Sequence, residues 1–460
     1  MENCTLYLKN EPVLLIQYEK NTLAFGDIIE IYNDKLIPIG VNTYPSTKLN
    51  NAMQKWWQSR VIPKNRESLD KTEIALLFEN TFGFNLSDQY WLKQENSDMT
   101  WEKGNFFTNN FNEDIGKYIT GTLAKNPDFE NMRTDTPDLF SNGEQDKRWV
   151  ILRNKRYLLK YGRPAYYQQP FNEKLASELC RLLGFNYVDY TFKIKGAKKL
   201  QIYSSCKCFI DEHTEYITAG YIQFVLKKDK KTSTFNHLIE CCRILNMPDI
   251  ETIKKKLYQM ILLDYIVANT DRHFGNFGFI RDIDTMEWKG FAPIFDTGNA
   301  MFYEYPTHDL KKSRSLMENV ESRSFNQTQK EELKKFSTEI ALLDIDLSRL
   351  KNLPDFYYDI LKENPKVEDE RRELLRSLLK ERIENANRII LTENKYSKDF
   401  LKTVKKLSDA GTNLEFCIPK AFSMLPQNSS ERKIVTKFLE YLNAKSPKDL
   451  AEKVSIFLCK

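Results

Sequence analysis

The most regular hydrophobic pattern in the chain predicts a helix over residues 250–268. Apolar side chains recur there at helical spacing, and Pro248-Asp249 is a typical helix start. The repeat ends near Asn269-Thr270, so the helix would deliver Asp271 into a loop at its C-terminal end. The apolar positions that define the repeat are Ile253, Leu257, Met260, Ile261 and Val267.

The pattern then changes to short strands. Phe277, Phe279 and Ile280 predict one strand, and residues 291–295 predict its hairpin partner, which would carry Asp296 at its end. Gly275 and Gly278 permit the tight backbone that such a loop needs.

Upstream, residues 131–225 predict a hairpin, a helix and a further strand pair. The hairpin spans 147–152 and 157–160, the helix spans 172–183 and ends at Gly184, and the strands span 187–194 and 199–210. Lys160 would emerge from an apolar strand. An edge strand that uses a lysine to prevent aggregation is an alternative explanation for it.

The two ends of the chain differ in pattern. Residues 1–130 contain short strands and many aromatic residues, including strands predicted at 13–16, 28–31 and 36–40, and we interpret them as an accessory region. After residue 320 the pattern is helical, with helices predicted at 331–343, 368–391 and 398–407. We therefore expect an accessory region (1–130), a small lobe (131–225), a large lobe (226–392) and a helical appendage (393–460).

Composition narrows the class of protein. The 460 residues can form two or three domains, and a net charge of +5 does not by itself predict nucleic-acid binding. No leader pattern and no apolar run long enough to cross a bilayer is recognisable, so we expect a cytoplasmic protein without membrane contact. The eight cysteines form no Cys-x-x-Cys pair, which argues against structural zinc and favours reduced thiols.

The loop after the predicted helix carries the candidate chemistry. Asp271 and Asn276 stand five residues apart, and Asp296 follows the next apolar segment. A protein kinase arranges its catalytic base and its magnesium ligands in this order, because carboxylate and amide oxygens suit a hard cation. Each motif alone could be an ordinary turn, with a buried ion pair in the first and an Asx turn in the second; their combination favours a phosphotransfer site.

Lys160 would supply the lysine that contacts nucleotide phosphates, paired with a glutamate of the helix at 172–183. Glu173 and Glu178 are both candidates, and Glu173 is favoured, although an acid at a helix start is also explained by the helix dipole. Asn142 and Gly143 are candidates for the phosphate loop, where backbone N–H groups could hold phosphate. Conventional kinases carry three glycines there, and this chain has one.

These segments resemble the HipA-like bacterial serine/threonine kinases. The resemblance covers roughly residues 131–350 and rests on LLKYG (158–162), NEKLASELCRLLG (172–184), DYIVANTDRHFGN (264–276) and APIFDTGNAM (292–301). It implies an α+β, two-lobed protein-kinase-like fold, with Asp271 as catalytic base, Asn276 and Asp296 as magnesium ligands and Lys160 as the ATP-binding lysine. Ser141 lies near the position of the family's autophosphorylated serine.

The hypothesis that follows is a kinase that uses ATP and Mg²⁺ to phosphorylate Ser or Thr of a protein. Some members of the family are toxins held by a DNA-binding antitoxin, which makes an antitoxin-like regulator a further expectation. A kinase-fold binding module with little or no activity and a small-molecule phosphotransferase remain alternatives. A lipid substrate is disfavoured because no basic amphipathic membrane helix is evident.

Overall fold

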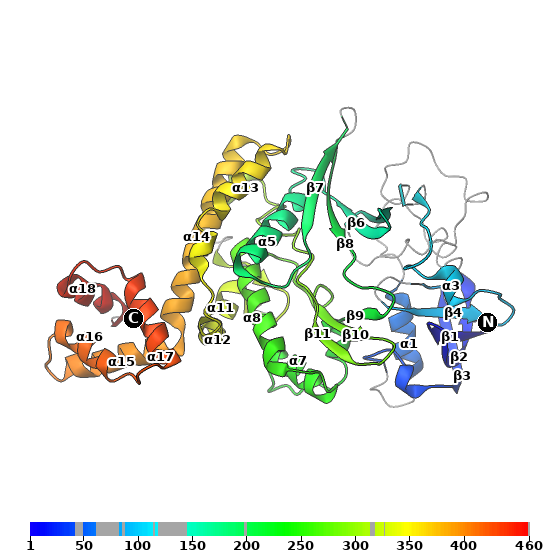
Figure 1. Ribbon diagram of the computed structural model, residues 1–460, viewed down its shortest axis with the longest axis horizontal. Coiled ribbons are helices and arrows are strands. Elements are labelled where there is room, and N and C mark those ends of the chain that lie inside the picture. Colours follow the sequence, from blue (N-terminus) through cyan, green and yellow to red (C-terminus); the bar gives the residue numbers. More distant parts are fainter. Residues whose placement is uncertain are drawn as a thin grey trace. The chain divides into compact units, whose positions relative to one another are not determined.

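Figure 1 shows the computed structural model of the chain with its helices and strands labelled. The chain divides into two compact units. Unit 1 comprises Met1–Ser177, Asn186–Ile250 and Arg272–Gly298, and unit 2 comprises Glu178–Phe185, Glu251–Asp271 and Asn299–Lys460. The structure describes residues 1–41, 49–60, 82–84, 88–113, 116–117, 145–196, 200–312, 318–325 and 327–458. Each unit consists of three separated segments, and the domain boundaries expected from the sequence stay predictions.

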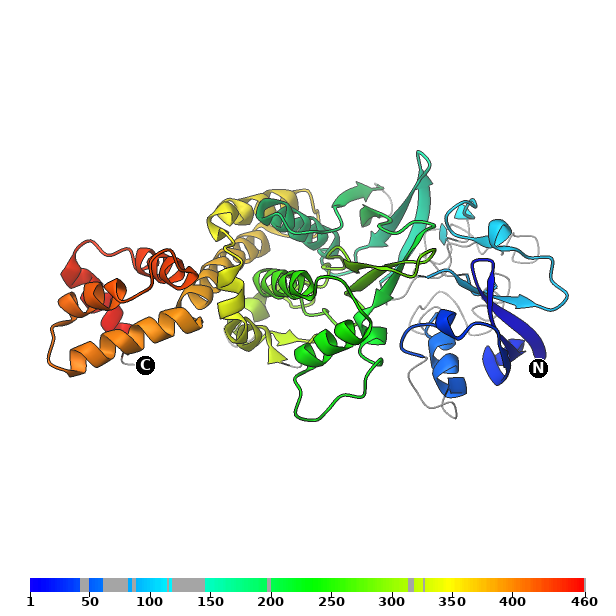
Figure 2. The same cartoon turned by 60° about the horizontal axis from the view of Figure 1, so that its bottom comes forward.

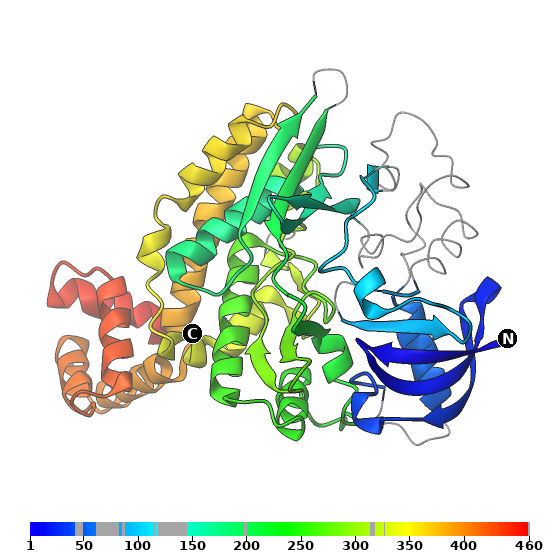
Figure 3. The same ribbon diagram turned by 45° about the vertical axis from the view of Figure 1, so that its right-hand side comes forward.

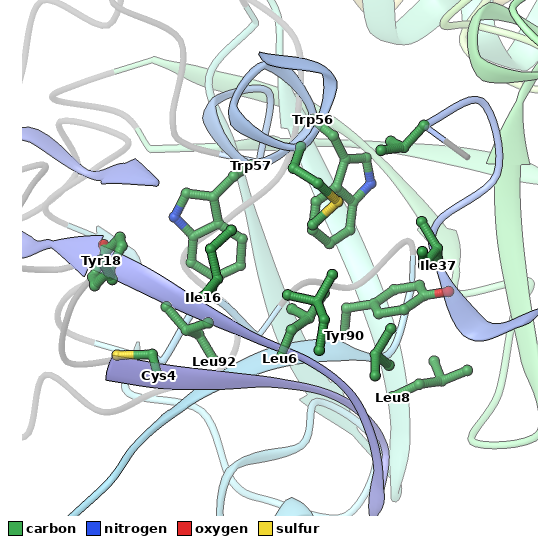
Figure 4. Close-up of a cluster of buried hydrophobic side chains, with 14 of the residues drawn as sticks. Cys4, Leu6, Leu8, Ile16, Tyr18, Ile37, Trp56, Trp57, Tyr90 and Leu92 are labelled. Atoms are coloured by element: carbon green, nitrogen blue, oxygen red, sulfur yellow. The ribbon is translucent and has the colours of Figure 1, made fainter. Parts of the chain in front are cut away.

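Unit 1 begins with a four-stranded antiparallel sheet in the order β3-β2-β1-β4. Alternate residues of β1 are buried, as a sheet with one covered face requires, and α1 covers that face (Figure 3). Figure 4 shows Trp56 and Trp57 of α1 packed over the strand residues Ile16 and Leu92. The elements are β1 (Glu2–Leu8), β2 (Glu11–Glu19), β3 (Ala24–Ile31), α1 (Leu49–Gln58), β4 (Tyr90–Gln94) and α3 (Trp101–Gly104).

One strand predicted in this region is wrong. Residues 36–40 form no strand, and their first residue ends a 3-10 turn at Asp34–Leu36. The carbonyl of Leu36 accepts a hydrogen bond of 2.7 Å from the buried Tyr90 hydroxyl. The apolar residues at 36–37 are therefore buried by packing against the sheet, and not by pairing with one of its strands.

The second sheet of unit 1 is also antiparallel, in the order β5-β6-β8-β7. The hairpin, helix and strand pair predicted from the sequence are confirmed, with small shifts of their ends. β6 lies between two strands, so the edge-strand explanation of Lys160 is wrong. The elements are β5 (Lys147–Leu152), β6 (Lys155–Tyr161), α5 (Gln169–Leu183, whose last turns belong to unit 2), β7 (Tyr190–Lys195) and β8 (Gln201–Lys207).

A third sheet, in the order β11-β10-β9, contains the predicted hairpin. A Cβ atom on Gly278 would lie 2.2 Å from the Ile217 carbonyl oxygen on β9, so only glycine permits this pairing. β11 ends at Phe291, and residues 292–295 do not continue it as predicted. The elements are β9 (Thr214–Thr218), α6 (Ala219–Ile222), α7 (Thr234–Ile244), β10 (Gly278–Asp282) and β11 (Trp288–Phe291).

Residues 292–295 pair elsewhere, because Ile294 forms an isolated parallel bridge with Tyr187. Its N–H donates to Asn186 O and its carbonyl accepts from Val188 N, both at 2.9 Å. This long-range pairing carries the chain from the third sheet toward the start of β7.

Unit 2 is almost entirely helical in its described residues. The predicted helix at 250–268 is confirmed as α8, and its apolar stripe is buried. The helix predicted at 331–343 is divided at Phe336 into α11 and α12. The elements are α8 (Ile250–Val267), α9 (Thr307–Lys312), β12 (Glu321–Ser322), β13 (Gln327–Thr328), α11 (Gln329–Lys335), α12 (Ser337–Leu342), α13 (Leu353–Lys362), α14 (Asp369–Glu393), α15 (Lys395–Asp409), α16 (Leu414–Ser423), α17 (Ser430–Tyr441) and α18 (Pro447–Leu458).

The last four helices lie next to one another in Figure 2. They pack around a core of their own that includes Phe400, Val404, Val435 and Phe438. The boundary of the helical appendage expected at 393–460 stays a prediction. Among the helices that the structure describes, none has the length and apolar character needed to cross a membrane.

Candidate active site

Lys160 is the centre of a buried charge cluster in unit 1. Its side chain is 3% exposed, and its Nζ donates to Glu173 Oε1 at 2.5 Å and to Asp296 Oδ1. The structure therefore decides between the two candidate glutamates: Glu178 pairs with Arg181 at 2.6 Å, three residues further along α5. α5 begins at Gln169, so Glu173 lies one turn inside the helix, and the helix dipole does not explain it.

The second carboxylate oxygen of Glu173 fixes the backbone next to Asp296. Glu173 Oε2 accepts hydrogen bonds from Thr297 N at 2.9 Å and from Thr297 Oγ1 at 2.7 Å. One residue earlier, Asn172 Nδ2 donates to Gly298 O at 2.8 Å. The first turns of α5 thus hold residues 297–298 while Glu173 holds Lys160.

Asp296 adopts the left-handed backbone conformation, with φ of 56°. Few non-glycine residues do so, although aspartate and asparagine tolerate it better than most. Its N–H donates to the Tyr190 hydroxyl at 3.4 Å. Its side chain is 30% exposed, in contrast to Glu173 at 1%. One carboxylate of the cluster is therefore enclosed, and the other is open to a ligand.

Opposite charges stabilise the ionised forms of this cluster. Burial alone would lower the pKa of Lys160, but the carboxylates of Asp296 and Glu173 raise it above its usual value. Burial alone would raise the pKa of Asp296, but Lys160, Lys147 and Arg272 lower it below its usual range. Both groups are therefore charged at neutral pH.

Sequence reasoning missed Lys147. It is directly opposite Lys160 in the β5–β6 register and is 7% exposed. Two lysines directly opposite each other repel, so such a pair is costly unless negative charge lies nearby. The register of the predicted hairpin was the signal that could have found it.

Arg272 organises the loop that carries Asn276. The guanidinium is buried and donates to Asn276 O at 2.7 Å and to Phe295 O at 2.6 Å. It therefore ties the loop to the residue before Asp296. Asn276 is 9% exposed, and its N–H donates to His273 O at 2.9 Å.

Asp271 lies in unit 2, in a polar cluster at the end of α8. Asn299 Nδ2 donates to Asp271 Oδ2 at 2.9 Å, and Arg323 Nη1 lies 2.6 Å from Oδ1. Asn269 supports the turn, because its side-chain oxygen accepts from Asp271 N at 3.2 Å and its amide donates to Asp264 at 2.8 Å. Asn299 and Arg323 were missed from the sequence, because they are 28 and 52 residues from Asp271.

The candidate residues of the phosphate loop cannot be located in the structure. Ser141, Asn142 and Gly143 are outside the residues that the structure describes. Within the described ranges, no group of three or more His, Cys, Asp or Glu side chains is placed to hold a metal ion by itself.

Part of the chain is similar to a known family of proteins. Residues 140–352 match the model of the HipA-like C-terminal domain. The chain is 23% identical over 197 residues to the serine/threonine-protein kinase CtkA of Helicobacter pylori, a match that covers 41% of this chain and 59% of that protein. The chain thus spans less than two thirds of the length of this curated relative.

Two solved structures were also matched. The Helicobacter pylori proinflammatory kinase CtkA matches with a TM-score of 0.41 and 22% identity, covering 53% of this chain and 94% of CtkA. HipA from Shewanella oneidensis, in complex with HipB and operator DNA, matches with a TM-score of 0.43 and 12% identity, covering 99% of this chain and 97% of HipA.

The expected fold class is confirmed as far as its mixed α and β composition, because the described residues form both sheets and helices. The match of residues 140–352 to the HipA-like C-terminal domain and the similarity to CtkA support the resemblance to HipA-like kinases that the sequence motifs predict.

Proposed function

We propose that this protein is an ATP- and magnesium-dependent kinase that transfers the γ-phosphoryl group to a serine or threonine hydroxyl of a protein. The observation that carries the proposal is the buried Lys160, ion-paired with the enclosed Glu173 and with the partly exposed Asp296. A charge cluster of this kind, with one open side, is suited to a ligand that carries both phosphate and metal.

The donor atoms proposed for the metal suit magnesium. Asp296 is ionised at neutral pH and partly exposed. Asn276, whose backbone oxygen shares the Arg272 guanidinium with Phe295 O, would add a carboxamide oxygen. Mg²⁺ in nucleotide sites is held by one or two protein oxygens together with phosphates and water, so a complete protein cage is not needed. When bound there, the ion would neutralise charge on the β- and γ-phosphates.

The protein's own residues would have separate tasks. Lys160 binds phosphate while Glu173 fixes its position, and Lys147 adds positive charge on the same hairpin. Asp271 accepts or orients the proton of the acceptor hydroxyl, with Asn299 holding one of its oxygens. Catalysis would then come mainly from positioning and from charge neutralisation.

Further parts of the proposal follow from the family. Autophosphorylation at Ser141, a phosphate loop containing Asn142 and Gly143, an antitoxin-like protein partner and a place in the cytoplasm are each proposed on that ground. No direct binding of nucleic acid and no membrane contact are expected. A small-molecule phosphotransferase or an inactive binding module would use the same Lys160 cluster, so the acceptor has to be tested separately from ATP binding.

The test has two stages. First, ATP with Mg²⁺ should raise the thermal unfolding temperature by about 5 °C at ligand concentrations far above the dissociation constant, and ATP alone should raise it less. Second, labelled phosphate from ATP should appear on the protein itself or on protein substrates. Binding without transfer would favour the inactive module, and transfer only to small molecules would favour the phosphotransferase.

A further inference from the structure

Arg323 contacts the carboxylate proposed as the catalytic base. Its Nη1 lies 2.6 Å from Asp271 Oδ1, while Asn299 Nδ2 lies 2.9 Å from Oδ2. Both carboxylate oxygens therefore have a nitrogen donor. A general base must come within hydrogen-bonding distance of the proton that it accepts. An acceptor hydroxyl directed at Oδ1 therefore approaches beside Arg323 and competes with it for that oxygen.

The local structure presents Arg323 outward. Arg323 directly follows β12 between two buried residues, Ser322 and Ser324, whose hydroxyl oxygens lie 3.0 Å apart. Ser322 Oγ also donates to Glu332 Oε2 at 2.7 Å, which anchors this segment to α11. Because both neighbours are turned inward, the side chain of Arg323 is 59% exposed.

The ion pair between Arg323 and Asp271 contributes little to the stability of the fold, because exposed ion pairs generally do. Stability therefore does not explain why the anchored segment around Arg323 exposes this arginine. Guanidinium is instead the side chain best suited to bind a carboxylate through two parallel hydrogen bonds. When an acceptor hydroxyl binds at Oδ1 of Asp271, Arg323 can bind another anion instead.

We propose that Arg323 recognises the acceptor, and that the enzyme prefers Ser or Thr beside an Asp or Glu residue. This inference rests on the kinase function proposed above. Without an acceptor, Arg323 pairs with Asp271. When an acidic acceptor binds, the acceptor's carboxylate forms an ion pair with the Arg323 guanidinium, and the acceptor's hydroxyl donates a hydrogen bond to Asp271 Oδ1. A neutral acceptor competes with Arg323 for Oδ1 without such compensation, and it therefore reacts more slowly.

The experiment compares two serine peptides of the same length, one with Glu and one with Gln beside the serine. For the wild type we expect kcat/KM to be about 3- to 10-fold higher for the Glu peptide than for the Gln peptide. One solvent-exposed, charge-assisted hydrogen bond accounts for a gain of this size. Arg323→Gln should bring this ratio close to one, with slower reaction of the Glu peptide and faster reaction of the Gln peptide. Arg323→Lys keeps the charge without the planar fork and should retain part of the preference.

Arg349 provides the matched control, since it is 62% exposed and ion-paired with Asp346 in the same unit. Arg349→Gln should leave the ratio unchanged. Phosphorylation of both peptides with no preference, or a preference unaffected by Arg323→Gln, would overturn the inference and leave the kinase function standing. If the wild type binds ATP with Mg²⁺ and phosphorylates neither peptide, the proposed protein-kinase activity fails, and the inference fails with it.

Discussion

Lys160 and Glu173 form a buried ion pair in which Nζ lies 2.5 Å from Oε1 and neither side chain is more than 3% exposed. Such a pair adds little stability compared with apolar residues of the same volume, but removal of one partner leaves the other charge buried and uncompensated. The pair is therefore better explained by a need for a fixed positive charge than by a need for stability.

Lys160→Met should both destabilise unit 1 and weaken ATP binding. The lost ammonium leaves Glu173 without its counter-charge, at a cost of about 3–5 kcal/mol. Denaturant unfolding without nucleotide measures this cost, and calorimetry measures ATP affinity. The double variant Lys160→Met, Glu173→Gln should recover much of the stability but none of the ATP affinity. Normal ATP affinity in either variant would contradict the role of Lys160.

Glu173→Gln should reduce turnover, whereas Glu178→Gln should not. Glutamine at 173 keeps a hydrogen-bond acceptor for Thr297 but loses the charge that holds Lys160. Glu178 instead pairs with Arg181, whose side chain is 59% exposed. Steady-state kinetics of the two variants, which are matched in chemistry and lie on the same helix, provide the comparison. Equal loss in both would mean that the helix, and not the ion pair, matters.

Asp296→Asn should remove the dependence of ATP binding on magnesium. Asparagine tolerates the left-handed backbone of this position, so the change removes charge without adding the strain that alanine would add. Titration calorimetry with ATP, with and without Mg²⁺, gives the readout. If affinity still depends on the metal as in the wild type, Asp296 is a structural residue.

Asp271→Asn should lower phosphoryl transfer by about 10²- to 10⁴-fold, the usual contribution of a general base, and leave ATP binding intact. The base acts on the acceptor hydroxyl, so nucleotide contacts do not depend on it. Asp359→Asn, at a 65% exposed aspartate of the same unit, is the control. Transfer at the wild-type rate in a preparation free of other kinases would rule Asp271 out as the base.

Glu332→Gln should reduce the dependence of stability on pH. Burial raises the pKa of Glu332 to about 7; the nearby Asp264 also raises it, and the Ser322 hydrogen bond and Lys335 lower it. A carboxyl whose pKa is higher in the folded state than in the unfolded state stabilises the fold fully at pH values below its unfolded-state pKa. This stabilisation is lost as the pH rises through the folded-state pKa of about 7.

The size of this effect is on the order of 1–3 kcal/mol. Urea unfolding of wild type and Glu332→Gln at pH 5, 6, 7 and 8 measures it as the difference between their midpoints. The wild type should lose stability relative to the variant across this range. Parallel curves would show that Glu332 does not titrate between these pH values in the folded protein.

Local patterns were sufficient to predict the elements around the site. α8, the β5–β6 hairpin and α5 were predicted near their observed bounds, because the spacing of apolar residues in each segment is typical of its own type of element. Residues 36–40 and 292–295 were predicted as strands and are not. In both segments the apolar side chains are buried by distant parts of the chain, which local periodicity does not reveal.

The sequence by itself determined the order of the polar motifs, since Asp271, Asn276 and Asp296 follow one another at recognisable spacing. Only the tertiary structure decided that Lys160 pairs with Glu173 and Asp296, and that Arg323 pairs with Asp271. These pairs join residues 13 to 136 positions apart. An ion pair depends on distance in space and on exclusion of water, and neither is set by separation along the chain.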